Sequence, residues 1–265
     1  MKNTMHSILK PFQRAGKAAI KLLFRPVYLR WSSLEGRVMT LEVAIDNLLA
    51  GLNGAGSEDF ALNGQRHRQQ IFDQLLSTFP FEAIVETGTF TGNTAGYMAR
   101  KTNLPVYTVE RNPRFHTIAK TRLKDFQNIT FALGDSRTCL SKFAGNGVAG
   151  KNTFFYLDAH WNEDLPLAEE IEIIGKNWKR FVIMIDDFQV PGDNGYGYDD
   201  DYGWWGRGLD MRSFAGVFSR CGLTPFFPAA PSASETGAKR GCVVLVKNED
   251  ADKTRTSVPA LAVKA

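Results

Sequence analysis

The strongest structural signal in this chain is Ala83-Ile84-Val85-Glu86-Thr87-Gly88-Thr89-Phe90-Thr91-Gly92-Asn93-Thr94. A short apolar run ends in an acid, a loop with two glycines follows at once, and the next residues suit a helix. This order is typical of a buried parallel strand that leads into a helix through a tight turn. Open α/β sheets bind ligands at the carboxyl ends of such strands. We therefore expect Gly88 and Gly92 to let the backbone approach a ligand closely.

Four more apolar runs end in acidic residues. They are 106–109 before Glu110, 129–133 before Gly134-Asp135, 154–157 before Asp158, and 181–185 before Asp186-Asp187. The ends of parallel strands lie along one edge of a sheet, so we expect these carboxylates to converge on one crevice. Any single acid could instead cap the following helix, but helix capping is a poor explanation of the whole set.

Helix-compatible segments separate these strands, at about 65–76, 92–101, 113–125, 136–143, 164–177 and 208–221. The alternation predicts an α/β protein with a doubly wound sheet. The runs 223–227 and 241–246 have no helix between them and predict a terminal antiparallel hairpin. The sequence thus predicts a mostly parallel, seven-stranded sheet in a domain at 65–247, after a linker at 56–64 and before a flexible tail at 248–265.

The first 55 residues differ in character from the rest. Residues 1–34 carry seven Lys or Arg and no acid, which leaves −3 on the remainder of a chain whose net charge is +4. The basic, amphipathic part of this segment suggests either a solvated helix face or peripheral contact with an anionic membrane. A nucleic-acid partner is not expected, because the remainder is acidic and no known binding motif is present.

A heptad seam follows, in which apolar residues alternate by four and three positions from Ile20 to Leu52. β-branched residues at a, such as Val38, and leucines at d, such as Leu41, favour parallel dimers. Trp31 at an a position and Gly36 within the helix weaken this pattern. The prediction is a homodimer formed through an N-terminal coiled coil, and the alternative is a helix that packs on its own domain.

Cysteine usage and hydropathy indicate a cytoplasmic protein. The three cysteines fit no metal-ligand spacing and read as reduced thiols. No uninterrupted apolar run approaches the roughly 20 residues of a membrane span.

The first two strand ends predict a site for an adenosine ligand. Glu110 lies 24 residues after Glu86, at a position from which an acid can accept hydrogen bonds from ribose hydroxyls. Asp135, with Ser136 beside it, could meet the adenine amino group. The loop is not a GxGxxG motif, so a ligand without pyrophosphate is favoured over a dinucleotide.

These motifs together resemble those of class I S-adenosylmethionine-dependent methyltransferases, over residues 65–247. The resemblance implies a Rossmann-like methyltransferase fold with S-adenosylmethionine as cofactor. It also implies that Glu86 and the glycine loop contact the methionine part, Glu110 the ribose and Asp135 the adenine. The full set of expected cofactor residues is Glu86, Thr87, Gly88, Thr89, Gly92, Thr94, Glu110, Asp135, Ser136 and Asp158.

The acids after the fourth and fifth strands predict a metal site. Adjacent strand ends would bring Asp158, Asp186 and Asp187 within coordinating distance of one divalent cation, and oxygen ligands suit Mg²⁺. The arrangement is similar to that of catechol O-methyltransferase and of the macrocin and mycinamicin sugar O-methyltransferases. That resemblance implies metal-assisted methylation of a hydroxyl, with Asp158 and the nearby His160 as catalytic residues. The alternative is that the Asp pair caps a turn without any ion.

A long loop of Gly, Asp and aromatic residues at 189–207 directly follows the Asp pair. Loops of this length are usually lids or binding loops. Its aromatic side chains would suit a small-molecule, sugar-containing acceptor: Tyr196, Tyr198, Tyr202, Trp204 and Trp205. They could equally be tucked into the core. Three other functions remain open: a metal-free N- or O-methyltransferase, an NAD-dependent sugar-modifying oxidoreductase, and a non-enzymatic membrane-surface or scaffold protein. The intact set of strand-end acids argues against the last of these.

Overall fold

The chain divides into two compact units, residues 1–54 and 55–265. The computed structural model describes Leu34, Arg37 and residues 60–160, 164–200 and 208–264. Leu34 and Arg37 are helical and exposed. The predicted basic face and heptad seam otherwise lie outside the described residues.

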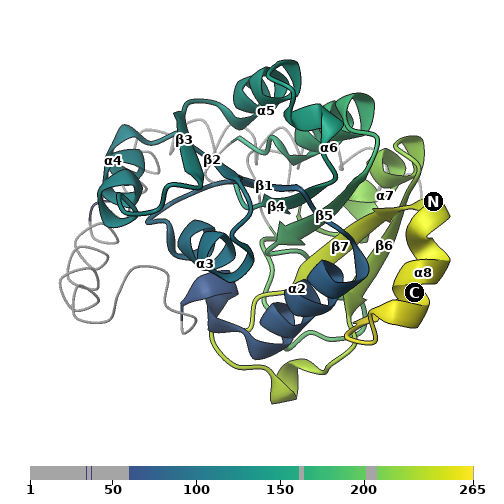
Figure 1. Ribbon diagram of the computed structural model, residues 1–265. Helices are drawn as coiled ribbons and strands as arrows, with labels where there is room; N and C mark the ends of the chain where they lie inside the picture. Colours follow the sequence, from purple (N-terminus) through teal and green to yellow (C-terminus); the bar gives the residue numbers. More distant parts are fainter. Residues whose placement is uncertain (1–33, 35–36, 38–59, 161–163, 201–207, 265) are drawn as a thin grey trace, which may run out of the picture. The chain divides into compact units, whose positions relative to one another are not determined.

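The second unit is built on one sheet in the order β3-β2-β1-β4-β5-β7-β6-β8 (Figure 1). Its strands are β1 (Ala83–Thr87), β2 (Val106–Glu110), β3 (Ile129–Leu133), β4 (Thr153–Leu157), β5 (Phe181–Asp186), β6 (Leu223–Pro228), β7 (Cys242–Lys247) and β8 (Leu261–Ala262). Strands β1 to β5 are parallel, whereas β7 runs antiparallel to both β5 and β6. The carboxyl ends of β1, β2, β4 and β5 therefore share one edge of the sheet, as the strand-end acids predicted.

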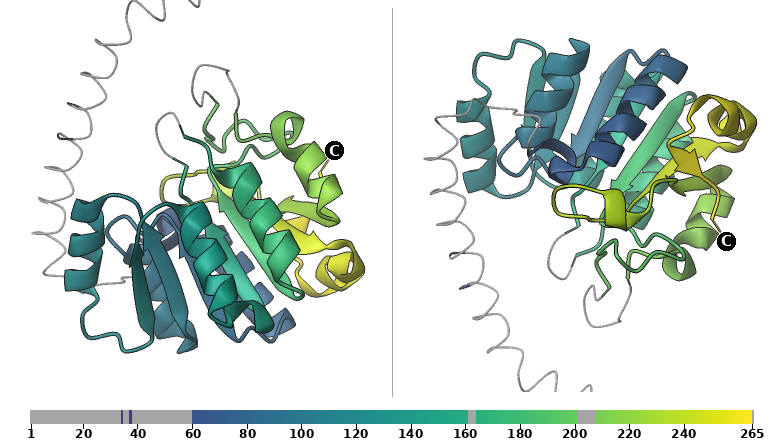
Figure 2. Two further views of the ribbon diagram at one scale, coloured as in Figure 1. Left: turned by 90° about the horizontal axis from the view of Figure 1, so that it is seen from above. Right: turned by 90° about the horizontal axis from the view of Figure 1, so that it is seen from below.

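Helices cover both faces of the sheet. The helices are α2 (Arg66–Thr78), α3 (Asn93–Thr102), α4 (Pro113–Arg122), α5 (Ser136–Gly145), α6 (Leu167–Asn177), α7 (Met211–Arg220) and α8 (Ala251–Ser257). Figure 2 shows the face of α5 and α6 on the left and the face of α2 on the right. Successive residues of a strand belong to two separate hydrophobic clusters, one on each face of the sheet. Val85 packs with residues of α5 and Ile84 with residues of α2. This alternation is the two-residue period of a strand buried on both faces.

The predicted linker at 56–64 is partly wrong. Residues Ala61–Gly64 form a short 3-10 segment, η1, in which Ala61 and Leu62 are fully buried. The Leu62 amide donates to Thr94 Oγ1 at 3.2 Å, which attaches the segment to the start of α3. The glycines and asparagines suggested a linker, but burial of the two apolar residues makes this segment part of the domain.

The flexible tail predicted at 248–265 is also wrong for its described residues. They form η5 (Asn248–Asp250), α8 and β8, and β8 pairs with β6 at the edge of the sheet as an eighth strand. Val258 and Thr254 are fully buried and Leu261 nearly so. Helix α8 is composed almost entirely of polar residues, and Thr254 is its buried residue. Its sequence therefore has no apolar periodicity from which a helix could be predicted. None of the described helices is long and apolar enough to cross a membrane.

Candidate active site

The loop between β1 and α3 adopts a conformation that requires its glycines. Gly88 and Gly92 have φ of 87° and 83°, and Phe90 between them has φ of 48°. A Cβ atom on Gly88 would lie 2.2 Å from the backbone oxygen of Asp158. The loop therefore passes directly over the end of β4, and only glycine fits at this crossing.

Glu86 lies beneath this loop and is 1% exposed. It accepts a hydrogen bond from Thr108 Oγ1 at 2.5 Å, and Thr108 in turn contacts Thr89 Oγ1 at 2.5 Å. Burial raises the pKa of Glu86 to about 8. Thr87 is also fully buried and Thr89 nearly so, so these predicted cofactor residues support the loop from below.

Glu110 ends β2, as predicted. Its carboxylate accepts hydrogen bonds from the backbone amides of Phe90 at 2.8 Å and Asn112 at 2.7 Å. Burial raises its pKa, although these amides oppose the shift. The bond to Phe90 joins the glycine loop to the end of β2, which fixes the carboxylate beside the loop.

Asp135 and Ser136 begin α5. Asp135 caps the helix by accepting from the amides of Arg137 and Thr138, and it forms an ion pair with the Arg137 guanidinium at 2.6 Å. Below them, the Glu170 carboxyl on α6 is 1% exposed and lies near the Ser136 and Thr87 hydroxyls, without a hydrogen bond of good geometry. Burial raises the pKa of Glu170 to about 7. Asp135 thus makes the helix-capping contacts that the sequence left open as an alternative role.

Three potential metal ligands meet at the ends of β4 and β5. One ligand atom each from Asp158, His160 and Asp187 lies within 4.8 Å of the other two. His160 Nε2 is 3.7 Å from Asp158 Oδ1. Burial lowers the pKa of His160 to about 4, which leaves the imidazole neutral at pH 7. Burial and the neighbouring carboxylates Asp186 and Asp187 raise the pKa of Asp158 well above its ordinary value, although 37% of its side chain is exposed.

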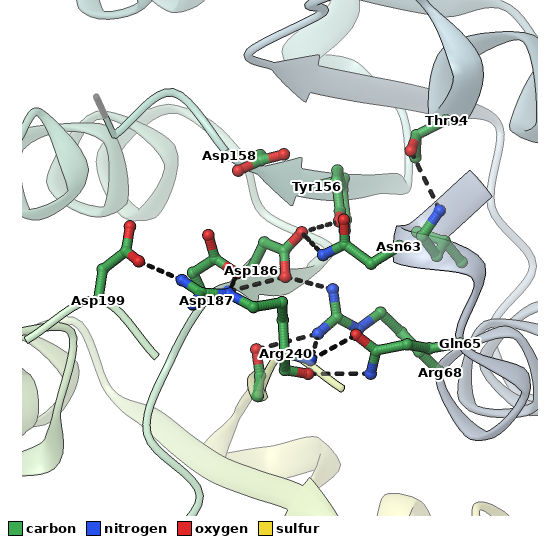
Figure 3. A network of polar contacts seen from close by, with 12 residues as sticks. Asn63, Gln65, Arg68, Thr94, Tyr156, Asp158, Asp186, Asp187, Asp199 and Arg240 are labelled. Atoms are coloured by element: carbon green, nitrogen blue, oxygen red, sulfur yellow. Dashed lines mark hydrogen bonds and ion pairs between the residues drawn. The ribbon is translucent and has the colours of Figure 1, made fainter. Parts of the chain in front are cut away.

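Asp186 lies beside this group, but its carboxylate is already saturated (Figure 3). Four donors reach it: Arg68 Nη1, the Asp187 amide at 2.7 Å, Asn63 Nδ2 at 2.9 Å and the Tyr156 hydroxyl at 2.5 Å. Burial would raise its pKa, but the Arg68 guanidinium and the Tyr156 hydroxyl hold that pKa below its ordinary value. The structure therefore brings the three predicted metal ligands together but gives Asp186 the environment of a buried, ion-paired anchor.

Asp187 is held in an unusual conformation, with φ of 53°. Its Oδ1 accepts from Arg240 Nε at 2.6 Å, and the Arg240 guanidinium also pairs with Asp199 (Figure 3). Burial and the charge of Asp186 raise the pKa of Asp187 to about 6 despite this arginine. Non-glycine residues with positive φ are strained and cluster at functional sites.

The predicted substrate loop divides into a packed part and a part outside the described residues. Tyr196 is 2% exposed and donates to the Ala230 carbonyl at 3.2 Å, so it is tucked into the core. Tyr198 is partly exposed, and the Asp199 amide donates to the Asp187 carbonyl at 3.1 Å. Tyr202, Trp204 and Trp205 lie outside the described residues.

Several residues of this network were not predicted. Arg68 is one, and a signal for it exists, because Arg68, Ile71, Phe72 and Leu75 form the buried stripe of α2 at helical spacing. A charged residue within such a stripe needs a buried partner. Asn63, Gln65, Tyr156 and Arg240 carried no comparable signal, because their roles depend on contacts between distant parts of the chain.

No protein-family model and no curated protein matches the sequence. Among solved structures, an O-methyltransferase from Bacillus cereus in complex with SAH is similar with a TM-score of 0.51 and 18% identity; the alignment covers 79% of this chain and 91% of that one. The chain has the Rossmann-like methyltransferase fold. The O-methyltransferase TomG from Streptomyces achromogenes, involved in tomaymycin synthesis and in complex with SAM, aligns with a TM-score of 0.49 and 18% identity over 68% of this chain and 79% of its own.

The methyltransferase fold confirms the predicted class of the chain, an α/β protein with a mostly parallel sheet and a terminal antiparallel pair. In this fold the glycine loop, Glu110 and the cluster of Asp158, His160 and Asp187 lie along the same edge of the sheet. Beyond β5 the sheet continues with the antiparallel strands β7 and β6, whereas the sheet of dinucleotide-binding enzymes continues with a second parallel half.

Proposed function

We propose that this protein is an S-adenosylmethionine-dependent O-methyltransferase that acts on a hydroxyl of a small-molecule acceptor with the help of a divalent cation. The observation that carries the proposal is the meeting of Asp158, His160 and Asp187 at the sheet edge that also holds the glycine loop. A cofactor site and a metal site side by side are what metal-assisted methyl transfer needs.

The residues on the cofactor side fit an adenosyl ligand. The Gly88 crossing keeps the loop free of side-chain bulk above β4, and Glu110 presents a fixed carboxylate suited to ribose hydroxyls. Asp135 and Ser136 remain the proposed adenine side. The Bacillus cereus structure, which shares the fold, is in complex with SAH, and this supports the choice of cofactor over NAD.

The residues on the reaction side fit a divalent cation. Two carboxylates and a neutral imidazole offer two oxygens and one nitrogen, a set that Mn²⁺ or Mg²⁺ accepts. The ligands we propose are Asp158, His160 and Asp187. Asp186 lies beside them and accepts a hydrogen bond from the Asp187 amide. A cation bound there would lower the pKa of an acceptor hydroxyl and fix its position.

Methyl transfer forms the bond between the acceptor oxygen and the methyl carbon and breaks the bond between that carbon and the sulfur. The hydroxyl proton must leave, and the acceptor we propose for it is the Asp158 carboxylate, which is 37% exposed and whose pKa is raised by burial and by its acidic neighbours. His160, with its pKa of about 4, is a better ligand than base at neutral pH. The partly exposed Tyr198 and Asp199 and the exposed Asp200 would contact the acceptor, which we propose is sugar-containing or polyhydroxylated.

The test is calorimetry followed by product analysis. The proposal expects binding of S-adenosylhomocysteine but not of NAD, and a product heavier by one methylene group when extracts receive labelled S-adenosylmethionine. Activity should disappear in excess EDTA and return with Mg²⁺ or Mn²⁺. Binding of NAD alone would overturn the methyltransferase proposal, and full activity in EDTA would overturn its metal component.

A metal-independent methyltransferase is the second candidate, and one specific observation favours it. Arg240 already places a cation on Asp187, so part of the negative charge is neutralised within the chain. The EDTA experiment separates the two candidates. We also retain dimerisation through the N-terminal helix and peripheral membrane contact as proposals about residues 1–54, and a cytoplasmic location as a proposal about the whole protein.

A further inference from the structure

The backbone of Arg240 is held by Gln65 at the start of α2 and by Arg68 on α2, and its side chain extends into the candidate active site (Figure 3). The Arg240 amide donates to Gln65 Oε1 at 2.7 Å, and its carbonyl accepts from Gln65 Nε2 at 2.9 Å and from Arg68 Nη2. On the other side, the Gly241 amide donates to the Gly197 carbonyl at 2.7 Å. The backbone of Arg240 is therefore fixed by α2 and by the loop after β5, unlike that of an ordinary surface arginine.

The guanidinium bridges two carboxylates from different segments. Nε lies 2.6 Å from Asp187 Oδ1, and Nη2 pairs with Asp199. Asp187 offers an atom to the candidate metal group as well. The same carboxylate thus serves both an internal cation and the proposed external one.

The charges of the described side chains show why this sharing matters. Four carboxylates gather here, from Asp158, Asp186, Asp187 and Asp199, against two guanidiniums, Arg68 and Arg240. Arg68 is 1% exposed and committed to Asp186, so it cannot respond to an added ion. Arg240 is 29% exposed, so its side chain is less confined than that of Arg68. A divalent ion bound to Asp187 would repel the guanidinium beside it at the short range where charges in a protein interact strongly.

We propose that Arg240 is an internal competitor of the divalent cation: its guanidinium occupies Asp187 when the ion is absent, and it sets how tightly the ion binds. The inference rests on the proposed metal site and adds a residue that controls it. Arg240 then offsets part of the negative charge of the site when the ion is absent, and the ion takes over that role at Asp187 when it is bound.

The experiment measures Mn²⁺ binding to the full chain by calorimetry. The Arg240→Gln variant should bind Mn²⁺ at least tenfold more tightly than the unmodified protein, and S-adenosylhomocysteine with unchanged affinity. The matched control is Arg220→Gln, which removes the same charge from a surface pair with Glu172 and should leave Mn²⁺ affinity unchanged. An affinity in Arg240→Gln that equals the control, or is weaker than it, overturns the inference.

A second measurement uses the unmodified protein, in case Arg240→Gln fails to fold. In proton–nitrogen NMR spectra, the Nε–H signal of Arg240, assigned with Arg240→Lys, should shift on addition of Mg²⁺ as it loses Asp187. If the ion binds and this signal does not move, the inference fails while the metal proposal stands. If neither the protein nor Arg240→Gln binds either ion, both fail.

Discussion

Gly88 and Asp158 touch through their backbones, so that a Cβ atom on Gly88 would lie 2.2 Å from the Asp158 carbonyl oxygen. The contact joins the proposed cofactor loop to the first proposed metal ligand. The two halves of the site, which come from β1 and β4, thus share one point of close approach. A displacement of the end of β1 or of β4 would therefore change both the proposed cofactor site and the proposed metal site.

The first prediction follows from this contact. Gly88→Ala should lower the free energy of unfolding by at least about 2 kcal/mol, because alanine is strained at a φ of 87° and its methyl group collides with β4. It should also weaken S-adenosylhomocysteine binding more than tenfold by calorimetry. Gly150→Ala is the control, since its added methyl group meets nothing within 4 Å. A Gly88→Ala protein with normal affinity would remove the loop from the cofactor site.

The second prediction separates the adjacent aspartates. Asp186→Asn leaves the buried Arg68 without an anion, and loss of one partner of a buried pair costs about 3–5 kcal/mol of stability. Asp187→Asn, at a carboxylate that is 20% exposed, should reduce Mn²⁺ affinity and turnover with much less loss of stability. Urea unfolding of both variants checks the stabilities. Both should retain S-adenosylhomocysteine binding at a temperature where they are folded, and loss of that binding in Asp186→Asn would place this residue in the cofactor site.

His160 provides the third prediction. His160→Ala removes the one nitrogen ligand of the proposed group, so Mn²⁺ affinity should fall by more than about tenfold, the smallest loss usual for residues that merely support a ligand. His116→Ala, on α4 near Phe131, is the matched control. If calorimetry gives equal Mn²⁺ affinities for the two variants, His160 is not a ligand.

The fourth prediction concerns pH and Glu170. Its pKa is about 7 in the folded protein and near 4.5 when the carboxyl is exposed. The folded state therefore binds the extra proton, and the stability this provides is complete below pH 4.5 and lost as pH rises through 7. Glu170→Gln should gain up to about 3 kcal/mol relative to the unmodified protein between pH 4.5 and pH 8. Chemical unfolding at both pH values measures this difference, and Glu169→Gln, at a side chain 59% exposed, should show little of it.

The fifth prediction concerns residues 1–54. If the heptad seam forms a parallel coiled coil, the full chain should sediment as a dimer and a chain that begins at residue 55 as a monomer. Two monomers would end the coiled-coil proposal. Two dimers would place the contact in the second unit.

The sequence predicted the parallel part of the sheet and its carboxyl edge well. The reason is local, since the strands from β1 to β5 are continuous apolar runs and each ends at a polar residue next to a turn. Prediction from the sequence was wrong for segments whose burial depends on contacts with residues distant in the chain. Ala61 and Leu62 resemble a linker until α3 covers them, and α8 resembles a tail because most of its side chains face solvent.

The candidate site shows the same division. Position along the strands brought Asp158, Asp186 and Asp187 together, but it could not assign their partners. Arg68 and Tyr156 saturate Asp186, and Arg240 occupies Asp187. These three residues lie on a helix, in a strand interior and in a loop, so no spacing rule connects them with the acids.

Arg68 also has a consequence for synthesis of the chain on the ribosome. Its buried guanidinium needs Asp186 and the carbonyls of Arg240 and Gly241, which emerge more than a hundred residues after it. Until then α2 would have to dock with a bare charge on its inner face, which is strongly unfavourable. Docking of α2 on the sheet therefore requires Asp186, Arg240 and Gly241 to have been synthesised. We expect a translation product truncated before these residues to be incompletely folded and sensitive to proteases.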